Sequence, residues 1–190
     1  MFLDASRHHY LAQLVDNVSL IGEELSQALT HSPDVRQALL TEMAMDYPSN
    51  QWTWENAINT DAVGYDLRQG SYTMLALYKP GHDLAAAQAA FRNTLAMLGD
   101  VEGINYACIS ALDPGAHLGL HTHSRSRHIF HLLLNDLEGG VCEIVCDGHR
   151  KTLARKGDTA LFDYSLPHES SNHSRSMRFN LMVDFLPAHR

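Results

Sequence analysis

The chain is poor in cysteine and in basic residues and has no long apolar run, and each shortage excludes a class of protein. Three cysteines in 190 residues are too few, and odd in number, for a disulfide scaffold. The 14 lysines and arginines against 22 acids give a formal net charge of -8, which argues against non-specific binding to nucleic acid. The chain has no run of about 18 apolar residues, the length needed to span a membrane. The beginning, MFLDASRHHY, does not resemble a secretory signal. We therefore expect a cytoplasmic chain with neither nucleic acid nor a membrane as partner.

What the chain does have is an apolar core and an unusual amount of histidine. Hydrophobic residues make up 45% of the sequence and aromatic residues 8%, which suits one folded domain with a helical annex. There are 13 histidines, and five of them fall between His117 and His131. That density is the first indication of chemistry.

The first half of the sequence predicts helices. Apolar residues recur at helical spacing, and Ser32 followed by Pro33 is typical of a helix start. We expect helices over 5–30, 33–45 and 83–98 and a strand over 71–78. Residues 1–50 would then form a helical region packed on a β domain over 51–190.

The second half predicts short strands separated by turns. The expected strands are 106–112, 118–123, 128–134, 142–146, 149–153, 159–163 and 176–185. Asp147-Gly148 is a strong hairpin signal. Strands at this spacing favour a mainly β sandwich or jelly roll with the helices on one outer face. Cys142 and Cys146 would share a strand face too far apart to bond, as buried thiols.

His121 and His168 are candidate metal ligands. An iron site that activates oxygen needs neutral imidazoles on one side of the metal and open positions on the other. Both histidines flank turns, where a side chain can point into the mouth of a barrel. Spacing alone is weak support, because an isolated histidine beside a strand is more often a surface or core residue.

Four ordered motifs strengthen this interpretation. They are Ser110 to His121 with the turn Pro114-Gly115, Gly140-Val-Cys142-Glu-Ile-Val-Cys146, Lys156 to Glu169 around His168, and Ser176-Met-Arg178-Phe179. In order and internal spacing the segment 110–185 resembles the aspartyl/asparaginyl β-hydroxylase family. The resemblance implies a double-stranded β-helix (a cupin-like jelly roll) that uses Fe(II) and 2-oxoglutarate, with His121 and His168 as the iron ligands.

The resemblance also implies how the co-substrate is held. Arg178 and Ser110 match the pair that binds the distal carboxylate of 2-oxoglutarate, and His131 matches a histidine near its metal-bound end. A guanidinium suits a carboxylate because it is permanently charged and can donate two parallel hydrogen bonds. No catalytic residue beyond the metal site is expected.

Two positions depart from the family. Ile129 stands where the family has an arginine, so we expect Arg127, on the same strand face, to bind the proximal carboxylate, with Arg125 as the reserve. His123 stands where the family commonly has glycine and most other 2-oxoglutarate oxygenases have a carboxylate. It is either a third metal ligand, a donor to a water in that place, or a histidine at the rim.

Other functions remain open. A three-histidine cupin, either a thiol dioxygenase or an isomerase without 2-oxoglutarate, also fits His121, His123 and His168, although it has no need of Arg178 and Ser110. A metabolite-binding jelly roll would leave the histidines without a role. A cysteine or serine nucleophile is poorly supported, because the cysteines lie in apolar strands and no Gly-x-Ser-x-Gly turn exists.

The substrate is the least determined feature. The resemblance suggests an amino acid, an aspartyl or asparaginyl residue, or an amino-acid-derived metabolite. The helices of the first half could cover the site or form a homodimer contact.

Overall fold

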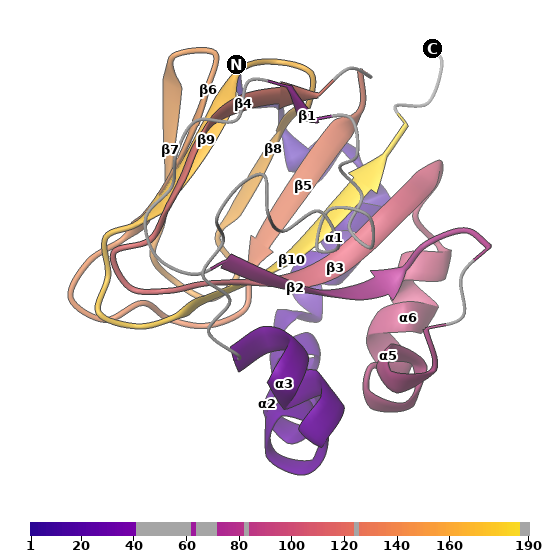
Figure 1. Cartoon of the computed structure of the whole chain (residues 1–190). Coiled ribbons are helices and arrows are strands. Elements are labelled where there is room, and N and C mark those ends of the chain that lie inside the picture. Colours follow the sequence, from indigo (N-terminus) through magenta and orange to yellow (C-terminus); the bar gives the residue numbers. More distant parts are fainter. Residues whose placement is uncertain (41–61, 64–71, 82–83, 124–125, 187–190) are drawn as a thin grey trace.

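The computed structural model describes residues 1–40, 62–63, 72–81, 84–123 and 126–186. In these ranges two antiparallel sheets face each other, and the helices lie on the outside of one of them (Figure 1). One sheet has the order β2-β3-β10-β5-β8 and the other the order β1-β4-β9-β6-β7. The helices are η1 (Ala5–Arg7), α1 (His9–Asp16), α2 (Val18–His31), α3 (Pro33–Leu40), α5 (Ala85–Ala90) and α6 (Arg92–Gly99). The strands are β1 (Ala62–Val63), β2 (Tyr72–Tyr78), β3 (Ile104–Leu112), β4 (His117–His123), β5 (His128–Leu133), β6 (Cys142–Cys146), β7 (His149–Leu153), β8 (Thr159–Asp163), β9 (His168–Asn172) and β10 (Arg178–Phe185).

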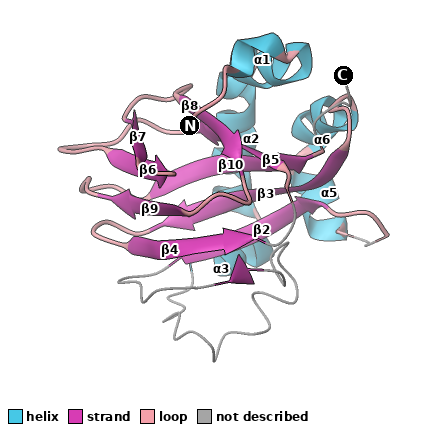
Figure 2. Cartoon of the chain, turned by 90° about the horizontal axis from the view of Figure 1, so that it is seen from above, coloured by secondary structure: helices cyan, strands magenta, loops and turns pink. Residues whose placement is uncertain are grey.

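The strand order identifies the fold. From β3 onward the chain crosses repeatedly between the sheets, so that β3, β5, β8 and β10 share one sheet and β4, β6, β7 and β9 the other. This is the arrangement of a jelly roll, or double-stranded β-helix. Within each sheet, hydrogen-bonded neighbours such as β4 and β9 run side by side (Figure 2). The predicted fold class is confirmed.

The side chains of strand β10 differ between its two faces. Its outward residues, among them Leu181 and Val183, belong to the apolar cluster shared with the helices. Met182 belongs instead to the cluster enclosed between the sheets, where Cys142 and Cys146 also lie. Since side chains alternate along a strand, Arg178 and Asn180 point into the barrel together with Met182.

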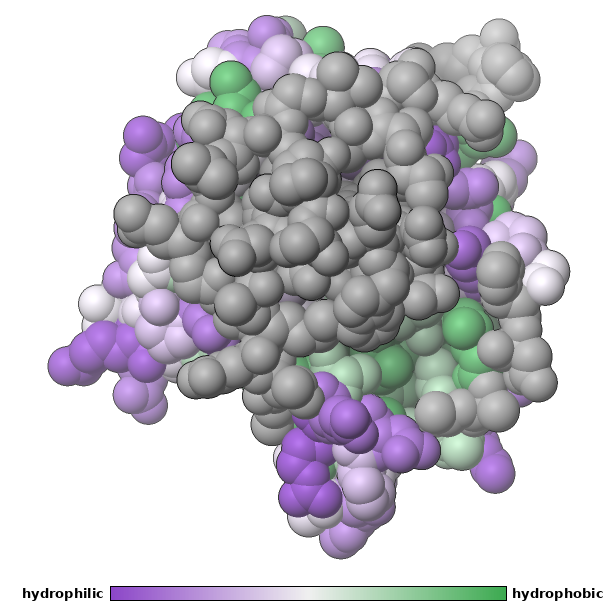
Figure 3. All heavy atoms as spheres, viewed as in Figure 1, coloured by the Kyte–Doolittle hydropathy of each residue, from purple (hydrophilic) through white to green (hydrophobic). Residues whose placement is uncertain are grey.

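The helices are shorter than predicted. The expected helix over 5–30 breaks at Asn17, whose φ of -103° and ψ of 16° are not helical, and that over 83–98 breaks at Phe91. The helix starting at Pro33 is described as far as Leu40, and its predicted continuation lies outside the described residues. Apolar side chains of α1 and α2 are buried against the sheet, whereas the surface over α2 and α3 is mostly hydrophilic (Figure 3).

The structure confirms one turn prediction and adds a strand that was not predicted. Asp147 and Gly148 have φ values of 50° and 73° and close the β6–β7 hairpin. The strand β9, with the sequence HESSN, lacks the apolar alternation of its neighbours. It forms because β4 pairs with one of its edges and β6 with the other.

The beginning of the chain covers part of an exposed sheet edge. Phe2 forms a β-bridge with Phe162 of β8, and the amide of Leu3 donates to the carbonyl of Leu161 at 2.7 Å. Capping an edge in this way limits its pairing with other chains. In the described part of the chain, no helix is long and apolar enough to cross a membrane.

Candidate metal centre

Three buried histidines come together between β4 and β9. His121 lies directly opposite His168 across the two strands, and their ring centroids are 4.1 Å apart. His123 follows two residues later on β4. Each of the three offers one ring nitrogen, and these nitrogens all lie within 4.8 Å of one another. The arrangement can hold a metal ion with three imidazoles.

Backbone carbonyls set the tautomers of two of these rings. The Nδ1 atom of His121 lies 2.8 Å from the carbonyl oxygen of Gly119, and Nδ1 of His168 lies 2.7 Å from that of Leu166. A carbonyl can only accept, so Nδ1 carries the proton in both rings and Nε2 keeps its lone pair. Nε2 of His168 is buried and makes no hydrogen bond within the described residues, so its lone pair is available to a metal ion.

Burial keeps these imidazoles neutral. It lowers the pKa of His121 to about 4 and holds the pKa of His168 well below its ordinary value. Only the neutral ring has a lone pair for a metal, so both side chains are ready to bind one at neutral pH. The donor set therefore fits a divalent transition metal.

His123 is held by an aromatic ring. Tyr164, which directly follows β8, stacks on it with a centroid distance of 3.7 Å and an interplanar angle of 20°. The His123 ring also lies nearly parallel to that of His168, at 5.4 Å and 26°. His123 is buried, so it does not lie at the rim, and its ring nitrogen belongs to the group of three that could hold a metal ion.

Arg178 reaches the same cavity from β10. This cavity of about 30 Å³ beside the histidines is lined by Tyr72, Leu118, His121, His131, Ile144, Phe162, Tyr164, His168, Glu169, Ser170, Arg178 and Met182. Arg178 is 1% exposed, and its Nη1 donates to Ser170 Oγ at 2.7 Å and to Cys142 Sγ at 3.3 Å. Its Nε has no hydrogen-bond partner, and within the described ranges no carboxylate pairs with it. A buried, uncompensated guanidinium is costly unless an anion joins it.

Ser110 and His131 also point into the barrel. Ser110, on β3, lies opposite Asn180, and its buried Oγ has no hydrogen-bond partner in the described residues. His131 lines the cavity with its ring stacked on Phe162 at 5.7 Å and 14°. Burial, together with the charge of Arg178, lowers the pKa of His131 to about 3, so this ring is neutral too.

Arg127 lies apart from this group. Its Nη1 binds Asp184 Oδ2 at 3.0 Å in a buried ion pair, and the amide of Asn105 donates to the same oxygen at 3.1 Å. Arg127 does not line the cavity beside the histidines. The other arginine named from the sequence, Arg125, lies outside the described residues.

The sequence analysis missed several residues of this site. Asn180 and Ser170 contact His131 and Arg178 respectively, and Tyr164 stacks on His123. A signal for Asn180 was available, because the three polar residues of the apolar strand Arg178–Phe185, namely Arg178, Asn180 and Asp184, all fall on one face of it.

The cysteines are poor nucleophiles, as predicted. All three are free and buried. Burial raises the pKa of Cys108 to about 12 and also raises that of Cys146. A thiolate is therefore disfavoured at both positions at neutral pH.

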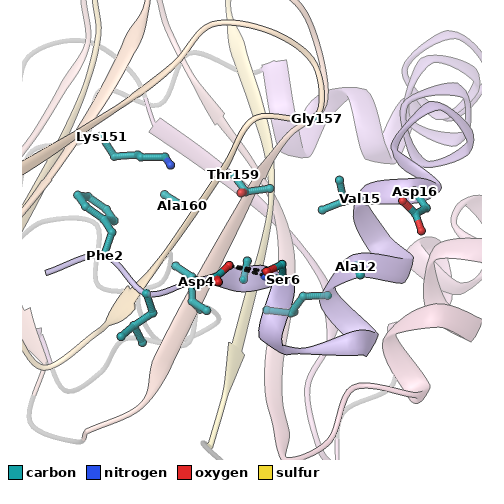
Figure 4. Close-up of a pocket in the computed structure, with 14 residues that line it drawn as sticks. Phe2, Asp4, Ser6, Ala12, Val15, Asp16, Lys151, Gly157, Thr159 and Ala160 are labelled. Carbon is teal, nitrogen blue, oxygen red and sulfur yellow. Dashed lines mark hydrogen bonds between the residues drawn. The ribbon is translucent and has the colours of Figure 1, made fainter.

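A larger cavity of about 380 Å³ lies on the other side of β8 (Figure 4). It is bounded by the first residues of the chain, by α1 and by the strands β7 and β8, with Phe2 and Lys151 at one end and Asp16 at the other. Asp4 and Ser6, which also line it, hydrogen-bond to each other. Histidine and cysteine are absent from its wall, so it lacks the donors of the smaller cavity.

The jelly roll places three clustered histidines where they could hold a metal ion. The family model of the aspartyl/asparaginyl β-hydroxylases matches residues 16–187, and the chain belongs to that family. This membership supports a metal-dependent hydroxylase. Among curated proteins, none matches the chain in sequence.

Solved cupin structures show a distant likeness. A predicted oxalate decarboxylase from Thermotoga maritima is 20% identical, with 63% of this chain and 84% of that chain covered and a TM-score of 0.42. The cupin domain of Schizosaccharomyces pombe Cnp3 is 10% identical over 66% of this chain and 69% of its own, with a TM-score of 0.43. A cupin 2 conserved barrel protein from Salinispora arenicola is 14% identical, with coverages of 62% and 76% and a TM-score of 0.39.

Proposed function

We propose that the protein is an Fe(II)- and 2-oxoglutarate-dependent hydroxylase. Its substrate would be an amino acid, an aspartyl or asparaginyl residue, or an amino-acid-derived metabolite. The observation that carries the proposal is Arg178, a buried guanidinium without a carboxylate partner in the described residues, in the same cavity as His121 and His168. A metal ion would bind the histidine nitrogens, and a dicarboxylic acid would supply a carboxylate for the guanidinium.

The histidines would hold the iron through Nε2, His121 and His168 with His123 beside them. When bound, iron(II) and 2-oxoglutarate supply the oxidising chemistry: the keto acid and oxygen become succinate and carbon dioxide, and one oxygen atom enters a C–H bond of the substrate. The carbonyls of Gly119 and Leu166 keep the two rings oriented for that task.

Arg178 and Ser110 would bind the distal carboxylate. The guanidinium has unused donor capacity at Nε, and the hydroxyl of Ser110 projects from the neighbouring strand on the same face. A charge-assisted pair of this kind is stronger than a neutral hydrogen bond, and the dry interior strengthens it further. Ser170, which accepts from Nη1, holds the guanidinium in place.

The present cavity is small for a dicarboxylic acid. About 30 Å³ accommodates roughly one water molecule. Met182 lines it and accepts a hydrogen bond from the Tyr72 hydroxyl at 3.5 Å. Methionine is unbranched and adapts its shape readily, so rotation of Met182 is the simplest way to make room.

A three-histidine cupin enzyme that does not use 2-oxoglutarate is the second candidate. The position of His123, within the same group of ring nitrogens as His121 and His168, favours it. The two candidates differ in their need for Arg178, which a thiol dioxygenase or an isomerase of that type would not require.

Anaerobic titration with iron(II) and then 2-oxoglutarate tests the proposal. We expect the weak visible charge-transfer band of the chelate in the wild type, its loss in His168→Ala, and a much higher 2-oxoglutarate requirement in Arg178→Ala. Iron binding without any band would favour the second candidate.

We further propose that the substrate is a small molecule or an aminoacyl group. We also propose that the helices of the first half of the chain form a homodimer contact.

A further inference from the structure

One histidine of the cavity is held differently from the others. His131, on β5, has its Nδ1 atom 3.3 Å from the side-chain nitrogen Nδ2 of Asn180 on the neighbouring strand β10. Asn180 is fully buried, and both side chains point into the barrel. No other hydrogen bond involves the His131 ring in the described part of the chain.

The direction of this hydrogen bond determines the tautomer of His131. An amide nitrogen can only donate, so Nδ1 must accept, and the single ring proton of a neutral imidazole then resides on Nε2. In His121 and His168 the opposite holds, because carbonyl oxygens keep the proton on Nδ1. One cavity therefore contains two rings that offer lone pairs and one that offers an N–H group.

The surroundings of His131 fix the direction of that N–H group. Stacking on Phe162 fixes the plane of the His131 ring. The pairing of β5 with β10 fixes the position of Asn180 relative to that ring. Phe162 also packs against His168, with centroids 5.2 Å apart, and Arg178 lies two residues from Asn180 on the same face. His131 thus lines the same cavity as His121, His168 and Arg178.

We propose that Asn180 is a positioning residue that holds His131 in its Nε2–H tautomer. In that tautomer His131 donates a hydrogen bond to an oxygen of the acid bound in the cavity, and it cannot compete with His121 and His168 for the metal. The identity of that acid rests on the proposed function, whereas the tautomer does not. Asn180 lies outside the motifs that carry the family resemblance, and His131 keeps the place near the co-substrate that the resemblance implies.

The tautomer can be measured directly, without turnover. Long-range proton–nitrogen correlation spectra of metal-free protein with ¹⁵N-labelled histidine separate the two ring nitrogens, and the His131→Gln variant assigns the signals. We expect the Nε2–H form in the wild type. In Asn180→Asp the carboxylate can only accept, so the ring should change to the Nδ1–H form. A wild-type ring already in the Nδ1–H form overturns the proposal, even if no variant folds.

Ligand binding supplies the second measurement. Asn180→Leu keeps the shape of the side chain and removes the donor, so 2-oxoglutarate should bind the iron(II) protein about tenfold more weakly, the effect of roughly one hydrogen bond. The Kd for the metal should stay the same, because the ligands keep their own carbonyl partners. Unchanged 2-oxoglutarate affinity overturns the donor role of His131. If wild-type protein binds no 2-oxoglutarate at all, the proposed function fails, and the spectra still decide the role of Asn180.

Discussion

His121 and His168 lie directly opposite each other on antiparallel strands, with each ring hydrogen-bonded to the carbonyl two residues before it. The pairing of β4 with β9 therefore brings the two rings together, because the register that joins the strands also fixes the distance between them. A shift of one residue in that register would turn one of the rings to the opposite face of the sheet.

Metal affinity should distinguish the roles of His168 and His123. We expect His168→Ala to raise the Kd for iron(II) or cobalt(II) by more than about 100-fold, since it removes a ligand whose ring is already oriented. His123→Ala should raise it by about tenfold or more if its ring nitrogen binds the metal. Anaerobic calorimetry measures both values. The exposed His149→Ala serves as the control, and equal affinities of His123→Ala and wild type would remove His123 from the ligand set.

The charge of Arg178 should matter for binding but not for folding. Arg178→Lys keeps the charge and loses the planar fork, so the Kd for 2-oxoglutarate should rise by about tenfold or more. Arg178→Met removes a buried charge and should leave the ligand-free protein equally stable or more stable, as measured by chemical denaturation. Arg150→Lys, in an exposed pair with Glu143, is the matched control. A large loss of stability in Arg178→Met would show that the guanidinium is needed by the fold itself.

Stability of the metal-free protein should fall in acid. Burial lowers the pKa of His131 to about 3 and that of His121 to about 4, from an ordinary value of 6.5. Above pH 6.5 both rings are neutral in the folded and in the unfolded chain. As the pH falls below 6.5, the two rings bind protons in the unfolded chain but not in the folded chain. Each ring therefore lowers the free energy of unfolding by up to about 1.4 kcal/mol per pH unit.

Denaturant unfolding between pH 7.5 and pH 4.5 checks this slope. His131→Gln should have a shallower slope than the wild type, by about one proton. If His131→Gln and wild type have the same slope, His131 is not neutral and buried in the folded protein in solution.

Glu24 should stabilise the helical layer independently of the metal. This buried carboxylate on α2 accepts four hydrogen bonds from the start of α6, two from Asn93 and two from Thr94. Glu24→Ala leaves those donors without an acceptor and should lower the free energy of unfolding by about 2–3 kcal/mol. The neighbouring exposed Glu23→Ala should have little effect. Metal affinity should be unchanged in both variants, and a loss of metal binding in Glu24→Ala would mean that the helices support the site.

Most of the architecture could be predicted from local patterns. Alternating apolar residues, turn dipeptides and the Ser32-Pro33 helix start placed the strands and helices within a few residues of their positions. The breaks at Asn17 and Phe91 could not be predicted, because the apolar spacing continues through both. The strand His168–Asn172 was missed because its sequence is polar, and its stability comes from the two strands that flank it.

The sequence by itself determined which side chains suit the proposed chemistry. They are His121 and His168, whose rings can be neutral, and Arg178, whose charge is permanent. Their motifs are local, so residue type and spacing are enough to identify them. Only the tertiary structure decided that His123 joins the cluster, that Arg127 is paired with Asp184, and that Asn180 contacts His131. Alternation along a strand leaves two possible faces for each side chain, and the choice depends on the partners that pairing and packing bring from distant parts of the chain.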